Sequence, residues 1–167
     1  MRADREKQLA LIADMSSKYE LALFQYIAVF ESYESLLREL FEDARDGKID
    51  NIWLHDEYID LDSRFKEVSK IHQLAFRSYR TLLFANRLED ELPSFSEPEE
   101  TPPADVACWA TIDRVLRKRM DAKVGLPKLV ECLPSLQLRI TLGLEGFRKA
   151  DVALQNRFVE LVKRAHR

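Results

Sequence analysis

Apolar side chains recur every seven residues along the first third of the chain. The residues of the two sets are Ile12, Tyr19, Tyr26, Tyr33 and Leu40, and then Leu23, Phe30, Leu37 and Ala44. The two sets lie three residues apart, which is the a and d spacing of a helix that packs along a seam. Gly47 follows the last of them and is expected to end the helix. The pattern predicts a helix from about residue 5 to residue 44.

A second amphipathic segment is expected from about residue 52 to residue 88. Its apolar positions alternate between spacings of four and three: Leu54, Tyr58, Leu61, Phe65, Val68, His72, Ala75, Tyr79 and Leu82. Two long helices with a short connection favour an antiparallel hairpin. His72 lies within about 20° of the core direction of this helix, so it is interpreted as a core side chain.

The last third of the chain is expected to add two more helices. Asp105 is a suitable N-cap for a helix to about residue 123 with Val106, Trp109 and Ile112 facing inward, and Gly125 and Pro127 are expected to stop it. From residue 136 to residue 144, leucines and isoleucine alternate with polar or small residues, which is the period of a strand. A helix is still favoured, because no other segment offers a partner strand.

These elements predict an all-α, four-helix bundle-like fold in one domain, residues 1–167. It would consist of a long N-terminal helical hairpin, residues 1–92, and a C-terminal helical pair, residues 105–167, joined by a proline- and glutamate-rich linker, residues 93–104. The composition agrees, because only four of the 167 residues are glycine and a third are charged, as in proteins made of long helices.

Charge divides the chain at the linker. Residues 1–104 carry 13 basic and 22 acidic side chains, a net charge of −9, whereas residues 105–167 carry 13 basic and 7 acidic side chains, a net charge of +6. Either the acidic and basic helices pack against each other, or a basic surface is kept for an anionic partner.

The cysteine content and the N-terminus favour a cytoplasmic protein. Cys108 and Cys132 make neither a disulfide framework nor a metal-binding pair of neighbouring cysteines, so they are expected to be reduced and buried. The N-terminus lacks an apolar signal core, and no apolar run approaches the roughly 20 residues that span a bilayer. No membrane association is therefore expected.

One stretch of the first helix is more apolar than a monomer needs. Residues 21–30, LALFQYIAVF, contain one polar side chain in ten. A helix that is apolar around most of its circumference must be covered on more than one side. Leu21, Phe24, Ile27 and Phe30 are therefore candidates for contact with a protein partner or a second copy.

Basic residues provide a second candidate surface. Arg114, Arg117 and Lys118 are expected on the outer face of the third helix, and Arg80 and Arg87 lie among aromatic residues of the second. Such a mixture can hold phosphates and stack bases. A nucleic-acid-contacting subunit is thus an alternative, and a solvated, salt-bridged face is the simpler explanation.

Residues 54–60, LHDEYID, provide a third candidate. Glu31 and Glu34, followed by Glu57 and Asp60, give the pattern ExxE…ExxD, which resembles the signature of the all-α NTP pyrophosphohydrolases (MazG-like). That resemblance implies carboxylates that hold Mg²⁺ on a nucleoside triphosphate. The other explanation is that these acids form the solvated start of the second helix, where the helix dipole favours negative charge.

No HExxH, GxSxG, P-loop or GxGxxG motif occurs in the sequence. The sequence therefore favours a non-enzymatic helical-bundle interaction protein without a cofactor, either an oligomer or a small subunit or adaptor of a larger assembly. Mg²⁺ belongs only to the pyrophosphohydrolase alternative.

Overall fold

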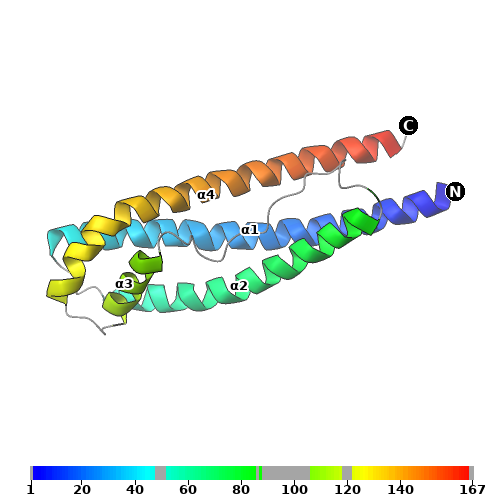
Figure 1. Ribbon diagram of the computed structural model, residues 1–167. Coiled ribbons are helices and arrows are strands. Elements are labelled where there is room, and N and C mark those ends of the chain that lie inside the picture. Colours follow the sequence, from blue (N-terminus) through cyan, green and yellow to red (C-terminus); the bar gives the residue numbers. More distant parts are fainter. Residues whose placement is uncertain (1, 48–51, 86, 88–105, 118–121, 166–167) are drawn as a thin grey trace. The chain divides into compact units, whose positions relative to one another are not determined.

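The described residues of the computed structural model are 2–47, 52–85, 87, 106–117 and 122–165. They form four helices and no strand: α1 (Arg2–Asp46), α2 (Ile52–Ala85), α3 (Val106–Leu116) and α4 (Ala122–Ala165) (Figure 1). α1 contacts both α2 and α4, as in a helical bundle. The all-α, bundle-like fold predicted from the sequence is confirmed.

The heptad pattern of α1 is its buried face. Every residue of the two predicted sets is buried, from Ile12 at 0% exposed to Phe30 at 8%. Each fully buried side chain of this size contributes roughly 1.5–3 kcal/mol to folding, so the seam explains why a helix this long is stable. Gly47 ends α1 as predicted: its φ is +75°, and its amide donates to the Ala44 carbonyl at 3.2 Å.

The chain forms two compact units, and each is assembled from distant parts of the sequence. Unit 1 comprises Met1–Ile27, Glu67–Pro98 and Glu145–Arg167, and unit 2 comprises Ala28–Lys66 and Glu99–Leu144. Each unit therefore contains segments from both the acidic and the basic part of the chain, so the units do not follow the division at the linker. The predicted linker, 93–104, lies outside the described residues.

The core of unit 1 is a group of stacked aromatic rings. Tyr19 stacks on Tyr79 with ring centroids 5.2 Å apart, and Tyr26 stacks on His72 at 4.8 Å. Phe147 of α4 meets the edge of Tyr26 at 5.2 Å. As residue numbers rise along α1 they fall along α2, which confirms the antiparallel hairpin. His72 is 1% exposed and is a core side chain, as interpreted from the sequence.

The core of unit 2 continues the pairing of α1 with α2 and adds α3. Phe30 and Tyr33 of α1 both meet the Phe65 ring edge-on, at 5.7 and 5.9 Å. Trp109 of α3 meets Tyr33 at 5.4 Å, and Ile112 is completely buried. α3 therefore covers the aromatic side chains that α1 and α2 present in this unit.

Two boundaries in the last third differ from the prediction. α3 ends at Leu116 instead of about residue 123, and Val106, expected to face inward, is 58% exposed. Pro127 lies inside α4, as does Pro134, and Figure 1 shows α4 bent in the part that carries them. A proline inside a helix costs about 3 kcal/mol, because it removes a backbone hydrogen bond and crowds the preceding turn. The burial of side chains such as Leu129 and Leu133, both 0% exposed, offsets that cost.

Residues 136–144 are helical, as favoured from the sequence. In a helix, the alternating pattern divides between two faces. Leu136, Ile140 and Leu144 are buried, at 0%, 2% and 0% exposed, whereas Leu138 and Leu142 are 60% and 55% exposed. The pattern that looked like a strand is thus one buried face of a helix plus two leucines on its outer face.

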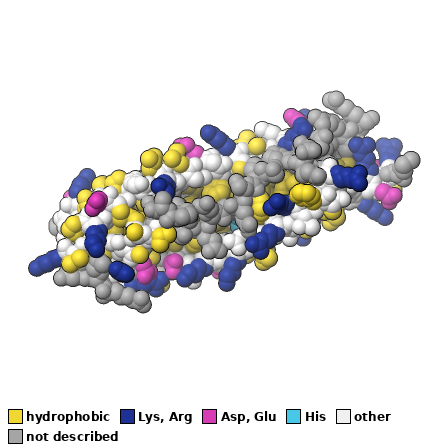
Figure 2. All heavy atoms as spheres, viewed as in Figure 1, with side chains coloured by type: hydrophobic (Ala, Val, Ile, Leu, Met, Phe, Trp, Pro, Cys, Tyr) yellow, Lys and Arg dark blue, Asp and Glu magenta, His cyan; other side chains and the backbone are white. Residues whose placement is uncertain are grey.

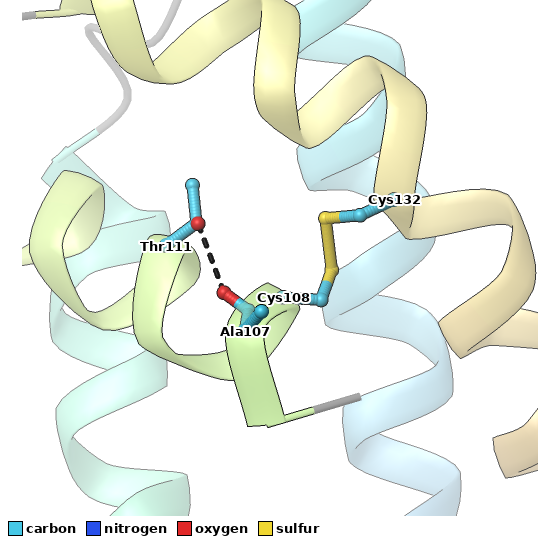
Figure 3. Close-up of a disulfide and its surroundings, with 4 residues drawn as sticks. All are labelled: Ala107, Cys108, Thr111 and Cys132. Atoms are coloured by element: carbon cyan, nitrogen blue, oxygen red, sulfur yellow. Dashed lines mark hydrogen bonds between the residues drawn. A yellow bond between two sulfur atoms is a disulfide. The ribbon is translucent and has the colours of Figure 1, made fainter. Parts of the chain in front are cut away.

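The prediction that the two cysteines are reduced is wrong, although Cys108 is buried as expected. Cys108 of α3 and Cys132 of α4 form a disulfide, with their Cα atoms 5.7 Å apart (Figure 3). The sequence could not show this, because the pairing depends on the approach of two helices within unit 2 and not on the 24-residue separation along the chain.

Among the helices of the described residues, none combines the length and the apolar composition needed to cross a membrane.

Candidate functional site

The segment LHDEYID at the start of α2 is an attachment point for α3. The His55 Nδ1 atom donates a hydrogen bond to the main-chain carbonyl of Leu116, at the C-terminal end of α3. The Tyr58 hydroxyl donates to the Asp113 carboxylate at 3.1 Å. One turn further along α2, Asp62 pairs with Arg117 at 2.9 Å. His55 and Tyr58 of this segment, together with Asp62, thus attach α2 to α3 within unit 2.

Arg117 and Tyr58 form the centre of this attachment. The Arg117 guanidinium binds Asp113 through Nε at 2.6 Å and lies 5.7 Å from the centroid of the Tyr58 ring. Burial and then the Asp113 carboxylate raise the pKa of Tyr58, so the phenol stays protonated and donates its hydrogen bond. The hydrogen bond to Asp113 in turn raises the pKa of Arg117.

Asp113→Ala is expected to destabilise unit 2 by about 1–3 kcal/mol, because it removes the acceptor of both Tyr58 and Arg117. The measurement is the free energy of unfolding by urea, followed by circular dichroism. The control is Asp56→Ala, which removes an exposed carboxylate from LHDEYID itself and is expected to change little. Equal effects of the two substitutions would contradict the assignment of Asp113 as an anchor.

The four carboxylates of the pyrophosphohydrolase resemblance have separate surroundings. Glu34 is half-buried and accepts a hydrogen bond from Thr141 at 2.8 Å, with Arg38 at 3.8 Å. Asp60 pairs with Arg64 at 3.7 Å, Glu31 is exposed, and Glu57 is half-buried. All four lie in the described part of the chain, in which no group of three or more His, Cys, Asp or Glu side chains is placed to hold a metal ion. The geometry therefore gives the Mg²⁺ alternative no support.

The predicted basic residues divide into paired and exposed ones. Arg117 is held by Asp62 and Asp113, so contact with a phosphate would require breaking these ion pairs. Arg80, Arg87 and Arg114 are exposed. Arg80 and Arg87 belong to unit 1 and Arg114 to unit 2. Lys118 lies outside the described residues.

The apolar stretch of α1 supplies a narrower surface than the sequence suggested. Ile27 and Phe30 are each 8% exposed and belong to the core, where Phe30 meets Phe65. Leu21 and Phe24 are 60% and 69% exposed. The sequence could not separate these residues, since an apolar stretch without interruption does not reveal which side of the helix is covered. We call the exposed pair, Leu21 and Phe24, the α1 face.

Charged residues border the α1 face. Lys18 pairs with Asp14 at 3.1 Å, one turn before Leu21. Glu20 adjoins Leu21, and its pKa is raised, first by burial and then by the charge of Asp151 on α4. Both carboxylates belong to unit 1. An apolar centre with a charged border is typical of a protein-binding surface.

Glu20→Gln is expected to change how stability depends on pH. Because the pKa of Glu20 is raised on folding, the folded chain binds more protons than the unfolded chain at pH values between its two pKa values. The contribution of Glu20 to stability therefore falls as the pH rises through this window. We expect Glu20→Gln to be more stable than the wild type at pH 7 and this advantage to shrink as the pH approaches the usual range of a glutamate.

The measurement is the free energy of unfolding of both proteins between pH 4 and pH 7. Glu39→Gln, which removes an exposed carboxylate from the same helix, serves as the control. A constant difference between Glu20→Gln and the wild type across this range would contradict the expectation.

His55 and Tyr58 of LHDEYID are engaged in holding α3, whereas Leu21 and Phe24 of the α1 face are exposed. Figure 2 shows hydrophobic side chains reaching the surface between charged ones at several places. Such a surface offers contact area to another molecule. Comparison of the chain with protein-family models, with curated proteins and with solved structures finds no match.

Proposed function

We propose that the protein is a non-enzymatic helical-bundle interaction protein that acts by binding another protein chain, as an oligomer or as a subunit or adaptor of a larger assembly. One observation carries the proposal: Leu21 and Phe24 are 60% and 69% exposed on a helix whose opposite face is buried. Each Å² of apolar surface removed from water contributes roughly 25 cal/mol to the free energy of binding. A partner that covers both the leucine and the phenylalanine would therefore be stabilised in the complex. Large aromatic side chains are also enriched among residues that dominate binding energy.

Affinity purification of tagged protein from its native cells tests the proposal, with quantitative comparison of wild type and Phe24→Glu. We expect at least one co-purifying protein to be lost from Phe24→Glu, because a charge at the centre of an apolar contact is desolvated without a partner. Gln25→Glu adds the same charge to the adjacent exposed position and is expected to keep that protein. The proposal fails if Phe24→Glu and wild type recover the same proteins in the same amounts.

Nucleic acid is the second candidate partner, supported by the exposure of Arg80, Arg87 and Arg114. Phosphate contacts release counterions, so binding through these residues must weaken steeply as salt rises. A titration of a labelled oligonucleotide at two salt concentrations tests this alternative. Binding that does not change with salt, or no binding at low salt, would exclude it.

The cellular compartment in which the protein resides is also a matter for a proposal. The sequence favours the cytoplasm, whereas the Cys108–Cys132 disulfide weighs against it, because disulfides persist mainly in oxidising compartments. Alkylation of free thiols in intact cells, followed by mass spectrometry, distinguishes the two. Alkylated Cys108 and Cys132 would indicate a reducing compartment, and unmodified cysteines an oxidising one.

A further inference from the structure

The C-terminal half of α2 has an exposed face that mixes cations with large apolar side chains. At 100° per residue, its members lie within about 120° of the helix circumference. They are Lys70, Leu74, Arg77, Arg80, Thr81 and Phe84, and all six are exposed. All six belong to unit 1. We call them the α2 face.

Two large apolar side chains of the α2 face are open to solvent. Leu74 is 64% exposed and Phe84 is 60% exposed. Both belong to a row at residues 70, 74, 77, 81 and 84, in which the spacing alternates between four and three. This is the spacing along which one helix packs on another. The α2 face therefore has the pattern of a docking surface for a helix.

The charges of the α2 face all have the same sign. Glu67 is the last acidic residue of α2, and the cations of the face follow it. Lys70 lies one turn before Leu74, and Arg80 lies one turn before Phe84, so each apolar side chain has a cation beside it. Charges across an interface are arranged with opposite signs facing each other. The α2 face is therefore complementary to a surface that carries carboxylates beside apolar residues.

The opposite side of the same part of α2 is fixed in the core of unit 1. Phe76 and Tyr79 are 3% and 2% exposed. The centroids of their rings lie 6.0 and 5.2 Å from that of Tyr19 on α1. The α2 face is thus held in its helical conformation before a partner arrives, and binding does not have to order the backbone.

We propose that the α2 face binds an acidic amphipathic helix of another protein. Apolar residues of that helix cover Leu74 and Phe84, and its carboxylates lie beside Lys70 and Arg80. The α2 face of a second copy does not fit. An antiparallel pair centred on Arg77 places Arg77 against Arg77, and a parallel pair in register places each cation against its own copy, so like charges repel.

Nucleic acid fits the α2 face less well than an acidic helix. Phosphates contact the cations, and bases stack on aromatic side chains. Leu74, the most exposed apolar residue of the face, has no ring on which a base could stack. An apolar residue of a partner helix covers a leucine and a phenylalanine equally well.

This inference goes beyond the proposed function, which rests on the α1 face, because it concerns a surface of α2 and gives the chemistry of its partner. The two can fail separately. Substitutions of Leu21 and Phe24 test the α1 face, and substitutions of Leu74 and Phe84 test the α2 face.

Fluorescence anisotropy of a labelled peptide with the full chain tests the inference. The acidic peptide is a helix of three heptads with leucines along one side and glutamates beside them, and the basic peptide has lysines in place of the glutamates. We expect the acidic peptide to bind with a dissociation constant below about 100 µM, and the basic peptide to bind at least about tenfold more weakly. Leu74→Glu with Phe84→Glu should weaken binding of the acidic peptide at least about tenfold.

Charge reversal tests the cations of the α2 face. Lys70→Glu with Arg80→Glu should weaken binding of the acidic peptide at least about tenfold and strengthen binding of the basic peptide, because opposite charges again face each other. The control, Leu21→Glu with Phe24→Glu, adds two negative charges to the α1 face and should leave both affinities unchanged. All of these positions are exposed, so the fold is expected to tolerate the substitutions, and circular dichroism checks this.

Failure of the acidic peptide to bind at about 100 µM would overturn the inference, as would equal binding of the two peptides. Wild-type affinity of Leu74→Glu with Phe84→Glu would also overturn it. Loss of binding in Leu21→Glu with Phe24→Glu would instead place the docking surface on the α1 face.

A labelled single-stranded oligonucleotide, titrated in the same way, tests nucleic acid on the same face. We expect it to bind more weakly than the acidic peptide. Tighter binding that is lost in Lys70→Glu with Arg80→Glu but kept in Leu74→Glu with Phe84→Glu would assign the α2 face to nucleic acid and overturn the inference.

Discussion

Tyr26→Ala is expected to lower the free energy of unfolding by about 3–5 kcal/mol, the cost of removing a large aromatic side chain from a packed core. Tyr26 is 1% exposed and lies at the centre of unit 1, where it stacks on His72 of α2 and meets Phe147 of α4. Its removal leaves a cavity shared by three helices. Urea unfolding monitored by circular dichroism measures the loss.

Phe24→Ala is the matched control, because it removes an aromatic side chain two residues away on the same helix. Phe24 is 69% exposed, so its removal creates no cavity and is expected to change stability by less than about 0.5 kcal/mol. The contrast between the two residues tests the orientation of α1. Similar losses for both, or a larger loss for Phe24→Ala, would mean that α1 buries a different face.

Reduction of the Cys108–Cys132 disulfide is expected to destabilise the protein by roughly 3 kcal/mol. The two cysteines lie 24 residues apart, and the chain-entropy treatment of disulfides gives about this value for a loop of that length. The bond joins α3 to α4 within unit 2. α3 has 11 residues, and an isolated helix of this length is marginal in water. Without the bond, α3 keeps its attachment to α2 through Asp113 and Arg117.

The measurement compares urea unfolding with and without a phosphine reductant. The variant Cys108→Ser with Cys132→Ser should be as unstable as the reduced wild type and should not respond to the reductant. Hydrogen exchange should locate the largest increase at the amides of α3. Equal stability of the oxidised and reduced wild type would contradict a stabilising role for the bond.

The fold could be predicted from the sequence because its helices are amphipathic over many turns. The heptad repeat from Ile12 to Leu40 identifies the buried face of α1 with no information about its neighbours. Gly47 marks the end of this helix because a residue with positive φ was needed there. For residues 136–144, the alternation of apolar with polar or small residues indicated a strand. The lack of a partner strand elsewhere in the sequence nevertheless favoured a helix.

Features that depend on contacts between helices could not be predicted. The pairing of Cys108 with Cys132 requires the Cα atoms of two helices to approach within 5.7 Å. The attachment of α3 depends on Tyr58 and Asp113, which lie 55 residues apart in the sequence. In the sequence, LHDEYID has the pattern of a solvated helix start or of a metal site, because its contacts with α3 depend on how the two helices pack.

The binding role of residues 21–30 stays a prediction. Their apolar sequence did not separate the exposed Leu21 and Phe24 from the buried Ile27 and Phe30.

Photo-crosslinking in living cells tests the central claim, that the α1 face binds another protein chain, most directly. Benzoylphenylalanine replaces Phe24, an exposed aromatic residue that tolerates a larger ring, and the control places it at Glu42, which is also exposed on α1. Irradiation is expected to give a discrete adduct of higher mass from position 24 that position 42 does not give. No adduct from position 24, or the same adducts from both positions, would contradict the claim.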